Sequence, residues 1–301
     1  MRRPVAPDDV AAIRRIAAAA EEADGHPALG DAVWRDLAQP TPASAVCVAS
    51  VDDEPVGVLH LAPPENDGEA IVTLSFVVHP EHRAENVERA LLDAALADPS
   101  VRDRRVVLWC FGADDAADRL AASLGFVPER ELRQMRVPLP LPLNPAWPPG
   151  IEVRPFRPGV DDHVWLTVNN RAFADDPDQR GWTIDVLRRR QREPWFDPGG
   201  FLLAWRGDAL AGFCWTKLHP ASPPRAREAI GEIYVIGVDP DHQGGGLGRA
   251  LVVGGLAALH ERGATVGMLF VEVANAAAVA LYETLGFTIA RVDRAYSREP
   301  S

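Results

Sequence analysis

The chain has 301 residues, of which 47% are hydrophobic, and it carries 31 basic against 43 acidic side chains, a formal net charge of −12. This length predicts two domains, and the hydrophobic fraction predicts a folded core, which excludes intrinsic disorder. The acidic surplus argues against a non-specific nucleic-acid binder or a protein held on an anionic membrane, because both need a basic face. A polyanionic ligand must therefore be bound locally, by backbone amides and a few arginines.

Export and membrane insertion are not predicted. Arg2 and Arg3 are basic but no apolar run follows them, and the longest nearly apolar stretch, 250–259, is too short to cross a bilayer. The cysteines Cys47, Cys110 and Cys214 are scattered and stand in no metal-ligand spacing, and the eight histidines form no zinc motif. We therefore expect a cytoplasmic monomer that acts on small molecules without a metal and without nucleic-acid or membrane partners.

Lysine is almost absent from the chain. Of the 31 basic residues all but Lys217 are arginine. A bias toward arginine codons explains this composition, and a lysine that persists under it is a candidate for a site that needs a compact point charge. A lysine on a solvated face is equally compatible with the sequence.

The predicted elements fall into two halves separated by the segment Pro138–Gly150, which contains six prolines and should be extended and stiff. The first half predicts a helix over 8–23, strands over 45–50, 55–61 and 70–78, a helix over 87–97, a strand over 105–111 and a helix over 115–124. The second half predicts a helix over 161–173, strands over 200–205, 210–217 and 230–238, a helix over 250–261, a strand over 267–273, a helix over 276–285 and a final pair of strands after Phe287.

The two halves repeat the same order of features. Residues 79–83 (HPEHR) align with 239–243 (DPDHQ), and 124–126 (LGF) align with 285–287 (LGF) at nearly the same offset. Two copies of one αβ unit follow, with open mixed sheets covered by helices on both faces, which is an α/β fold.

A glycine-rich segment, Gln243-Gly-Gly-Gly-Leu-Gly-Arg249, joins the strand over 230–238 to the next helix. The amides at a helix start favour negative charge, and glycines let the backbone approach a pyrophosphate closely. Arg249 can add a cation. The motif is neither a Rossmann fingerprint nor a P-loop.

Together with the strand end Val238-Asp-Pro240, Asn275 and the segment 280–287 (ALYETLGF), this loop resembles the GNAT superfamily of acyl-CoA N-acyltransferases. The resemblance implies two tandem GNAT-like mixed-sheet αβ domains, 1–140 and 151–301, with acetyl-CoA as the acyl donor and no metal. The positions that it assigns to acetyl-CoA are Ile236, Gly237, Val238, Gln243, Gly244, Gly245, Gly246, Leu247, Gly248, Arg249, Asn275, Ala276, Ala277, Ala278, Val279 and Ala280.

Within the superfamily the chain is most similar to the mycothiol synthase family, which is itself built from tandem GNAT domains. The segments that carry this similarity are 131–139, 168–173, 181–183, 193–198, 212–219 and 231–240. The resemblance implies transfer of acetyl from acetyl-CoA to the cysteinyl amine of des-acetyl mycothiol, the last step of mycothiol biosynthesis. The alternatives are a GNAT enzyme for another small amine, such as an aminoglycoside, and a non-catalytic acyl-CoA-binding regulator.

Amine acetylation needs a base for the amine proton and an acid for the leaving thiolate. Glu232 lies inside an otherwise apolar strand, where a bare carboxylate is costly, and the resemblance makes it the base; a strand glutamate facing solvent is the alternative. The resemblance makes Tyr282 the acid, although a tyrosine packed under the Leu-Gly-Phe turn is also possible. Asn275 fits either a contact to pantetheine or phosphate or a plain helix cap.

The resemblance further implies substrate contacts at Asp31, Asp178, Lys217, Glu232 and Phe270. Asp178 replaces the family's usual glutamate in a turn-rich segment that is also typical of a solvated loop. Phe270 replaces a tyrosine whose hydroxyl meets the substrate, which removes a hydrogen bond of about 0.5–1.5 kcal/mol and predicts weaker or altered binding. Asp31 is equally typical of a helix N-cap or a surface charge.

The first half lacks the same chemistry. Val72 stands where Glu232 does and Ala121 where Tyr282 does, while Asn86 and Glu88 replace two glycines of the loop. A carboxylate in that loop would repel a pyrophosphate. We therefore expect the first domain to be degenerate and non-catalytic, and to have lost acetyl-CoA binding.

Overall fold

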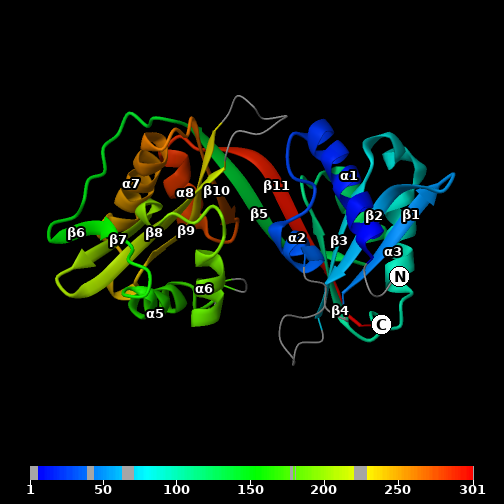
Figure 1. The fold of residues 1–301 in the computed structure, drawn as a ribbon, viewed down its shortest axis with the longest axis horizontal. Coiled ribbons are helices and arrows are strands. Elements are labelled where there is room, and N and C mark those ends of the chain that lie inside the picture. The colour runs from blue at the N-terminus through cyan, green and yellow to red at the C-terminus, as the bar shows by residue number, and fades with distance from the viewer. Residues whose placement is uncertain are drawn as a thin grey trace. The chain divides into compact units, whose positions relative to one another are not determined.

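The structure, a computed structural model, describes residues 6–38, 44–62, 71–176, 179, 181–219 and 229–300, and these form two compact units (Figure 1). Unit 1 comprises Met1–Arg133, Glu272–Ala274 and Arg291–Ser301, and unit 2 comprises Gln134–Val271 and Asn275–Ala290. Each unit has a mixed sheet with helices on both faces, which confirms the α/β expectation.

In unit 1 the strands are ordered β1-β2-β3-β4-β11. Its elements are α1 (Pro7–Asp24), α2 (Asp31–Ala38), β1 (Ala45–Val51), β2 (Glu54–Ala62), β3 (Ile71–Val78), η1 (Pro80–Glu85), α3 (Val87–Leu96), β4 (Arg105–Cys110), α4 (Asp115–Ser123) and the start of β5 (Val127–Pro138). Helices α3 and α4 pack on one face around Leu91 and Leu108, and α1 and α2 pack on the other around Ile16 and Val58. β3 and β4 are parallel, whereas β2 is antiparallel to both of its neighbours, β1 and β3.

In unit 2 the strands are ordered β5-β10-β9-β8-β7-β6. Its elements are β6 (Ile151–Pro155), α5 (Asp162–Ala172), α6 (Ile184–Gln191), η2 (Pro198–Gly200), β7 (Phe201–Arg206), β8 (Ala209–His219), β9 (Ile230–Val238), η3 (Pro240–His242), α7 (Leu247–Glu261), β10 (Val266–Glu272), α8 (Ala276–Thr284) and β11 (Thr288–Arg298). α7 and α8 cover one face around Leu251 and Ile233, while α5 and α6 cover the other around Trp165 and Trp215 (Figure 1).

The repeat predicted from the sequence is present in the fold. β3, η1, α3, β4 and α4 of unit 1 follow the same order as β9, η3, α7, β10 and α8 of unit 2. The loops before α3 and α7 even share a backbone state, because Asn86 and Gly246 are both left-handed, at φ 58° and 80°. Asparagine tolerates this conformation better than most residues, which explains how unit 1 keeps the turn without the glycine.

The last strand of each repeat contributes to both units. β5 begins in unit 1 and belongs to unit 2 from Gln134 onward, and β11 begins in unit 2 and belongs to unit 1 from Arg291 onward. Within unit 1, β11 pairs with β4 from Arg294↔Cys110 to Arg298↔Val106. The compact units are therefore not contiguous in the sequence.

Three features differ from the expectations. Among the described residues a single strand, β11, follows Phe287 in place of a pair, and the helices α2 and α6 and the strands β5 and β6 were not predicted. The proline-rich segment has no helix or strand over 139–150, as expected, but it packs on the core: Trp147 lies against α7 where a Cβ on Gly254 would come within 2.8 Å of its ring. Among the described residues, no helix is both long and apolar enough to span a membrane.

Candidate active site

Glu232 lies on β9, a strand flanked by β8 and β10 in the sheet of unit 2, and is only 8% exposed. Its Oε2 lies 2.6 Å from Nε2 of His219, the last residue of β8. The carboxylate is thus buried with a hydrogen-bond partner, as its burial requires. The expectation that Glu232 sits in an apolar strand is met, and the alternative of a glutamate facing solvent is not.

β9 carries an irregularity two residues after Glu232. Its register with β8 shifts between Trp215 and Thr216, whose partners are Val235 and Ile233, so Tyr234 is the extra residue of a β-bulge. Gly237 pairs regularly, and it is glycine because a Cβ there would come within 2.9 Å of the Phe213 ring.

β9 and β10 separate at the same position along β9. Their parallel pairing runs from Val266↔Ile230 to Leu269↔Ile233. Beyond this point both strands continue, through residues that the structure describes, without pairing to each other, β9 to Val238 and β10 to Glu272. The separated backbone of β9 includes Ile236–Val238, which the family resemblance assigned to acetyl-CoA. Amides and carbonyls freed from a strand partner at this position can bind an extended ligand in the manner of an added strand.

The glycine loop forms the start of α7. Gly244 and Gly246 have φ values of 84° and 80°, a conformation that favours glycine, and a Cβ on Gly244, Gly245 or Gly246 would meet no atom within 4 Å. Gly246 caps the helix without a side-chain hydrogen bond, so the first amides of this 15-residue helix are left for a ligand. Exposed backbone N–H groups and the helix dipole together make an anion site.

The packing of α7 on the sheet places this helix start beside the end of β9. A Cβ on Gly255 would come within 2.4 Å of the Cys214 sulfur on β8, and one on Gly231 within 2.8 Å of Leu259. These glycines let the helix approach the strands closely. At the exposed end of α7, Arg249 donates from Nη1 to Thr284 Oγ1 at 3.0 Å, which links α7 to α8.

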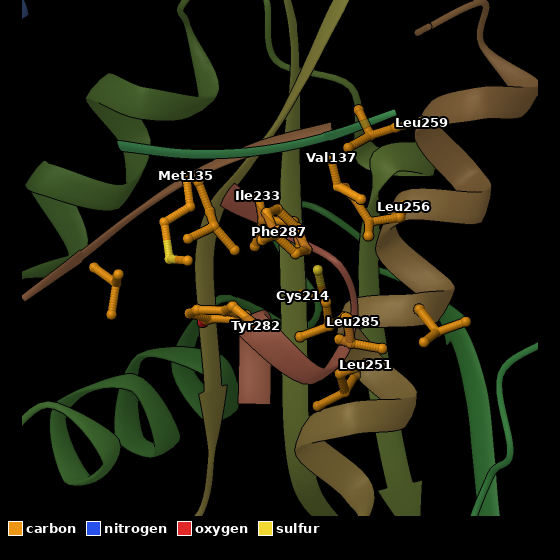
Figure 2. Packing of buried hydrophobic residues seen from close by; sticks show 14 of the residues in the cluster. Met135, Val137, Cys214, Ile233, Leu251, Leu256, Leu259, Tyr282, Leu285 and Phe287 are labelled. Atoms are coloured by element: carbon orange, nitrogen blue, oxygen red, sulfur yellow. The ribbon is translucent and has the colours of Figure 1, made fainter. Parts of the chain in front are cut away.

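Tyr282 reaches from α8 into the core between the helices and the sheet, beside Cys214, Leu285 and Phe287 (Figure 2). Burial raises the pKa of its phenol to about 12, with a smaller contribution from the nearby Cys214. The phenol therefore stays protonated through the neutral range and remains a hydrogen-bond donor. Asn275 caps α8, since its Oδ1 accepts from the Ala278 amide at 3.2 Å, and the residues 276–280 assigned to acetyl-CoA form the first turns of this helix.

Lys217 stands directly opposite Glu232 on the neighbouring strand, because the two residues are cross-strand partners in the β8–β9 ladder. Its Nζ lies 5.1 Å from the centre of the Trp195 ring and 5.9 Å from that of Tyr234. The charge of the single lysine is thus held on the face of the sheet that also carries Glu232. Phe270 stands two residues after Met268, the parallel partner of Glu232, at the point where β10 leaves β9.

Two predicted substrate residues are not placed in this site. Asp178 lies outside the described residues. Asp31 is the first residue of α2 in unit 1, and its side chain is not among those that the structure describes.

Unit 1 shows how the fold looks without these features. Val72 and Ala121 are buried in its apolar core, and the pairing of β3 with β4 runs on to Ser75↔Trp109. β2 and β3 pair without a register shift. Burial raises the pKa of Glu88, whose carboxylate also accepts a hydrogen bond from its own backbone amide at the start of α3.

His219 and the bulge at Tyr234 were missed by sequence reasoning. The segment 212–219 was noticed only for its similarity and for Lys217. The register of two antiparallel strands would have placed His219 near Glu232, but the long connection between them leaves that register undetermined in the sequence. In the described parts of the chain, no group of three or more His, Cys, Asp or Glu side chains is arranged to hold a metal.

Comparison with known proteins identifies the family. The sequence pattern of the Acetyltransferase (GNAT) family matches residues 10–126 and 166–287, one match in each repeat. A protein named mycothiol acetyltransferase from Thermobispora bispora is 46% identical over 97% of both chains. A second protein of that name, from Catenulispora acidiphila, is 44% identical over 96% of this chain and 95% of its own.

Two solved structures share the fold. A GCN5-related N-acetyltransferase from Sphaerobacter thermophilus has a TM-score of 0.74 at 24% identity and covers 98% of this chain and 94% of its own. A tandem GNAT protein from the clavulanic acid biosynthesis pathway also has a TM-score of 0.74, at 21% identity, covering 99% of this chain and 97% of its own. With a glycine-rich helix start, a separated central strand and a family match in both repeats, this chain belongs to the acetyltransferase (GNAT) family and is an N-acetyltransferase.

Proposed function

We propose that the enzyme transfers the acetyl group of acetyl-CoA to the cysteinyl amine of des-acetyl mycothiol, the last step of mycothiol biosynthesis. The observation that carries the proposal is the position of Glu232. It is buried at the point where β9 and β10 separate, and its register partner on the neighbouring strand β8 is Lys217. The two relatives named mycothiol acetyltransferase are 46% and 44% identical over nearly the whole chain, which supports the same acceptor.

The donor would lie along the separated part of β9. In this arrangement the amides from Gln243 to Arg249 bind the pyrophosphate, and Ile236–Val238 bind the pantetheine arm and the thioester carbonyl through the backbone. The start of α8, from Asn275 to Ala280, flanks the pantetheine. The support is the uncapped start of α7 together with the open space around its three glycines.

The reaction then needs no acyl-enzyme. The acceptor amine attacks the thioester carbonyl directly, a carbon–nitrogen bond forms, and the carbon–sulfur bond breaks as coenzyme A leaves. Glu232 takes the proton that the amine loses, and Tyr282 donates a hydrogen bond or a proton to the departing thiolate. Backbone N–H groups of β9 stabilise the oxyanion that develops on the carbonyl.

On the acceptor side, the ammonium group of Lys217 would contact the sugar–inositol part of the substrate. Phe270 would line the same pocket with an apolar ring, and Asp31 and Asp178 are proposed as further substrate contacts. In this proposal the catalytic domain is 151–301, and the domain 1–140 is degenerate.

We further propose that the enzyme works as a monomer in the cytoplasm, on small-molecule substrates, without a metal and without nucleic-acid or membrane partners. All three cysteines are unpaired, which fits a reducing compartment. The net charge of −12 disfavours polyanionic partners.

Phe270 leaves room for a second candidate acceptor. Phe270 stands where the resemblance implies a tyrosine hydroxyl, and without it another small amine, such as an aminoglycoside, becomes a candidate substrate. The two candidates share the donor site and the base and differ only in the acceptor pocket.

Mass-spectrometric turnover of the purified protein tests the proposal. Acetyl-CoA is supplied with des-acetyl mycothiol, and glucosamine-bearing amines compete. Product formation from des-acetyl mycothiol alone would support the proposed acceptor, and preferential acetylation of the others would reject it in favour of another amine. Acetyl-CoA binding without any product would point to an acyl-CoA-binding regulator.

A further inference from the structure

His219 joins the buried base to the surface of unit 2. The Glu232 side chain is 10% exposed and the His219 side chain is 35% exposed, and 2.6 Å separates their nearest atoms. The two residues are diagonal neighbours on adjacent strands, because His219 pairs with Ile230, two positions before Glu232. Side chains at such positions point to the same face of the sheet and reach each other when they are long.

The contact assigns different tasks to the two carboxylate oxygens. A carboxylate oxygen only accepts hydrogen bonds, so a proton on Nε2 of His219 must be donated to Oε2 of Glu232. Oε2 is thereby engaged, and Oε1 is left for the proton of an attacking amine. A carboxylate held by one oxygen also keeps its rotamer, whereas a free glutamate side chain samples several.

The neighbouring charge does not duplicate this contact. Lys217 is the direct cross-strand partner of Glu232, and its Nζ lies over the rings of Trp195 and Tyr234. Among the described residues, the hydrogen bond to His219 is the contact that fixes the Glu232 carboxylate.

We propose that His219 is a positioning residue for the reaction: its Nε2–H holds Oε2 of Glu232 so that Oε1 faces the acceptor amine. The inference rests on the proposed function, since Glu232 must be the base for its orientation to matter. It adds a residue to which neither the composition nor the glycine-loop motif points.

Steady-state kinetics of His219→Ala and His219→Gln test the proposal. Glutamine can donate from its side-chain amide and should stay within about fivefold of the native kcat. Alanine should lower kcat about 10- to 100-fold at unchanged KM for acetyl-CoA, as part of the roughly 10²- to 10⁴-fold that general base catalysis contributes. The matched control is His82→Gln in unit 1, where His82 contacts Glu85 at 2.8 Å, and it should leave kcat unchanged.

Chemical rescue separates a hydrogen-bond donor from a packing role. The His219 side chain is partly exposed, so imidazole can enter the space left in His219→Ala. Added imidazole should raise the kcat of this variant several-fold. At a pH where both compounds are neutral, N-methylimidazole has no N–H and should not restore it. A kcat of His219→Ala within twofold of the native value, or equal rescue by both compounds, would overturn the proposal.

A measurement on the free protein keeps this test separate from that of the acceptor. Nitrogen NMR of histidine-labelled protein, with His219 assigned from the His219→Gln spectrum, should show a proton on Nε2 that shifts in Glu232→Ala. A proton on Nδ1 alone would overturn the positioning role whichever amine is acetylated. If des-acetyl mycothiol is not a substrate but another amine is, the proposed acceptor fails, and the same variants measured with that amine decide the role of His219.

Discussion

Replacing Gly248 with glutamate should stabilise unit 2 and at the same time abolish tight binding of acetyl-CoA. Gly248 is the second residue of α7, and a Cβ there would meet only Val238, at an ordinary 3.8 Å. A Cβ at this position therefore meets no clash. Unit 1 already carries this residue as Glu88, whose carboxylate lies at its own backbone amide at the start of α3.

The two effects have opposite signs because they have different causes. Glycine in a helix costs about 0.5–1 kcal/mol relative to a better helix former, and a carboxylate in the first turn adds about 0.3–1 kcal/mol through the helix dipole. The unfolding free energy should rise by about 1 kcal/mol, a thermal midpoint gain of roughly 2–4 °C. Two like charges 4 Å apart repel by about 4 kcal/mol near a protein surface, and screening leaves about 2–3 kcal/mol, or about 30- to 150-fold weaker binding.

Calorimetric titration with acetyl-CoA and thermal unfolding measure both quantities on the same protein. Gly248→Gln is the matched control, because it adds a side chain of the same size without the charge and should weaken binding far less. Native affinity in Gly248→Glu would refute the assignment of the α7 start to the pyrophosphate. The native stoichiometry should be one acetyl-CoA per chain, and Glu88→Gly should leave it at one because unit 1 also lacks the bulge and the early strand separation.

Three further changes test the rest of the site. Glu232→Gln should lower kcat about 10²- to 10⁴-fold with unchanged acetyl-CoA affinity by titration, and a native rate would remove Glu232 from the reaction. Tyr282→Phe should reduce the alkaline loss of stability. Since burial raises the pKa of Tyr282 from 10 to about 12, the unfolded chain releases this proton first, and the unfolding free energy falls by about 2–3 kcal/mol across that pH range in the native protein. If the unfolding free energy of Tyr282→Phe fell as steeply between pH 9 and pH 12 as that of the native protein, the result would contradict a buried phenol at Tyr282. Trp195→Leu should raise the acceptor KM about 2- to 30-fold by releasing Lys217 from its ring, whereas Trp205→Leu, which removes the ring below Arg154, should not.

The predictable part of the site is the part that local sequence signals determine. β9 has the predicted bounds of 230–238, and α8 begins at Ala276 as predicted. The loop before α7 follows from glycines whose positive φ values are a local requirement, although α7 begins at Leu247, three residues before the predicted start at 250. Each of these features depends on neighbouring residues alone, so a single sequence is enough to find it.

The remainder depends on pairing between distant residues. His219 reaches Glu232 only because β8 and β9 adopt one register, and the bulge at Tyr234 is a property of that pairing. Likewise, the pairing of β11 with β4 joins residues almost two hundred positions apart, and no periodicity in either strand specifies the partner. Register and partner choice are set by the packed sheet as a whole, which is why sequence reasoning did not find the bulge at Tyr234.

The two repeats separate what the fold needs from what the chemistry needs. Unit 1 keeps the strand order, the left-handed turn before its helix and helices on both faces, although it has Val72 where unit 2 has Glu232, and Glu88 at the helix start. Folding therefore requires neither the buried carboxylate nor the open glycine loop. In unit 2 the burial of Glu232 and the early separation of β9 from β10 carry a cost in free energy that unit 1 avoids by longer pairing and an apolar core. A feature that costs stability and is absent from an otherwise equivalent fold is best explained by the reaction, and this supports the proposal that catalysis takes place in unit 2.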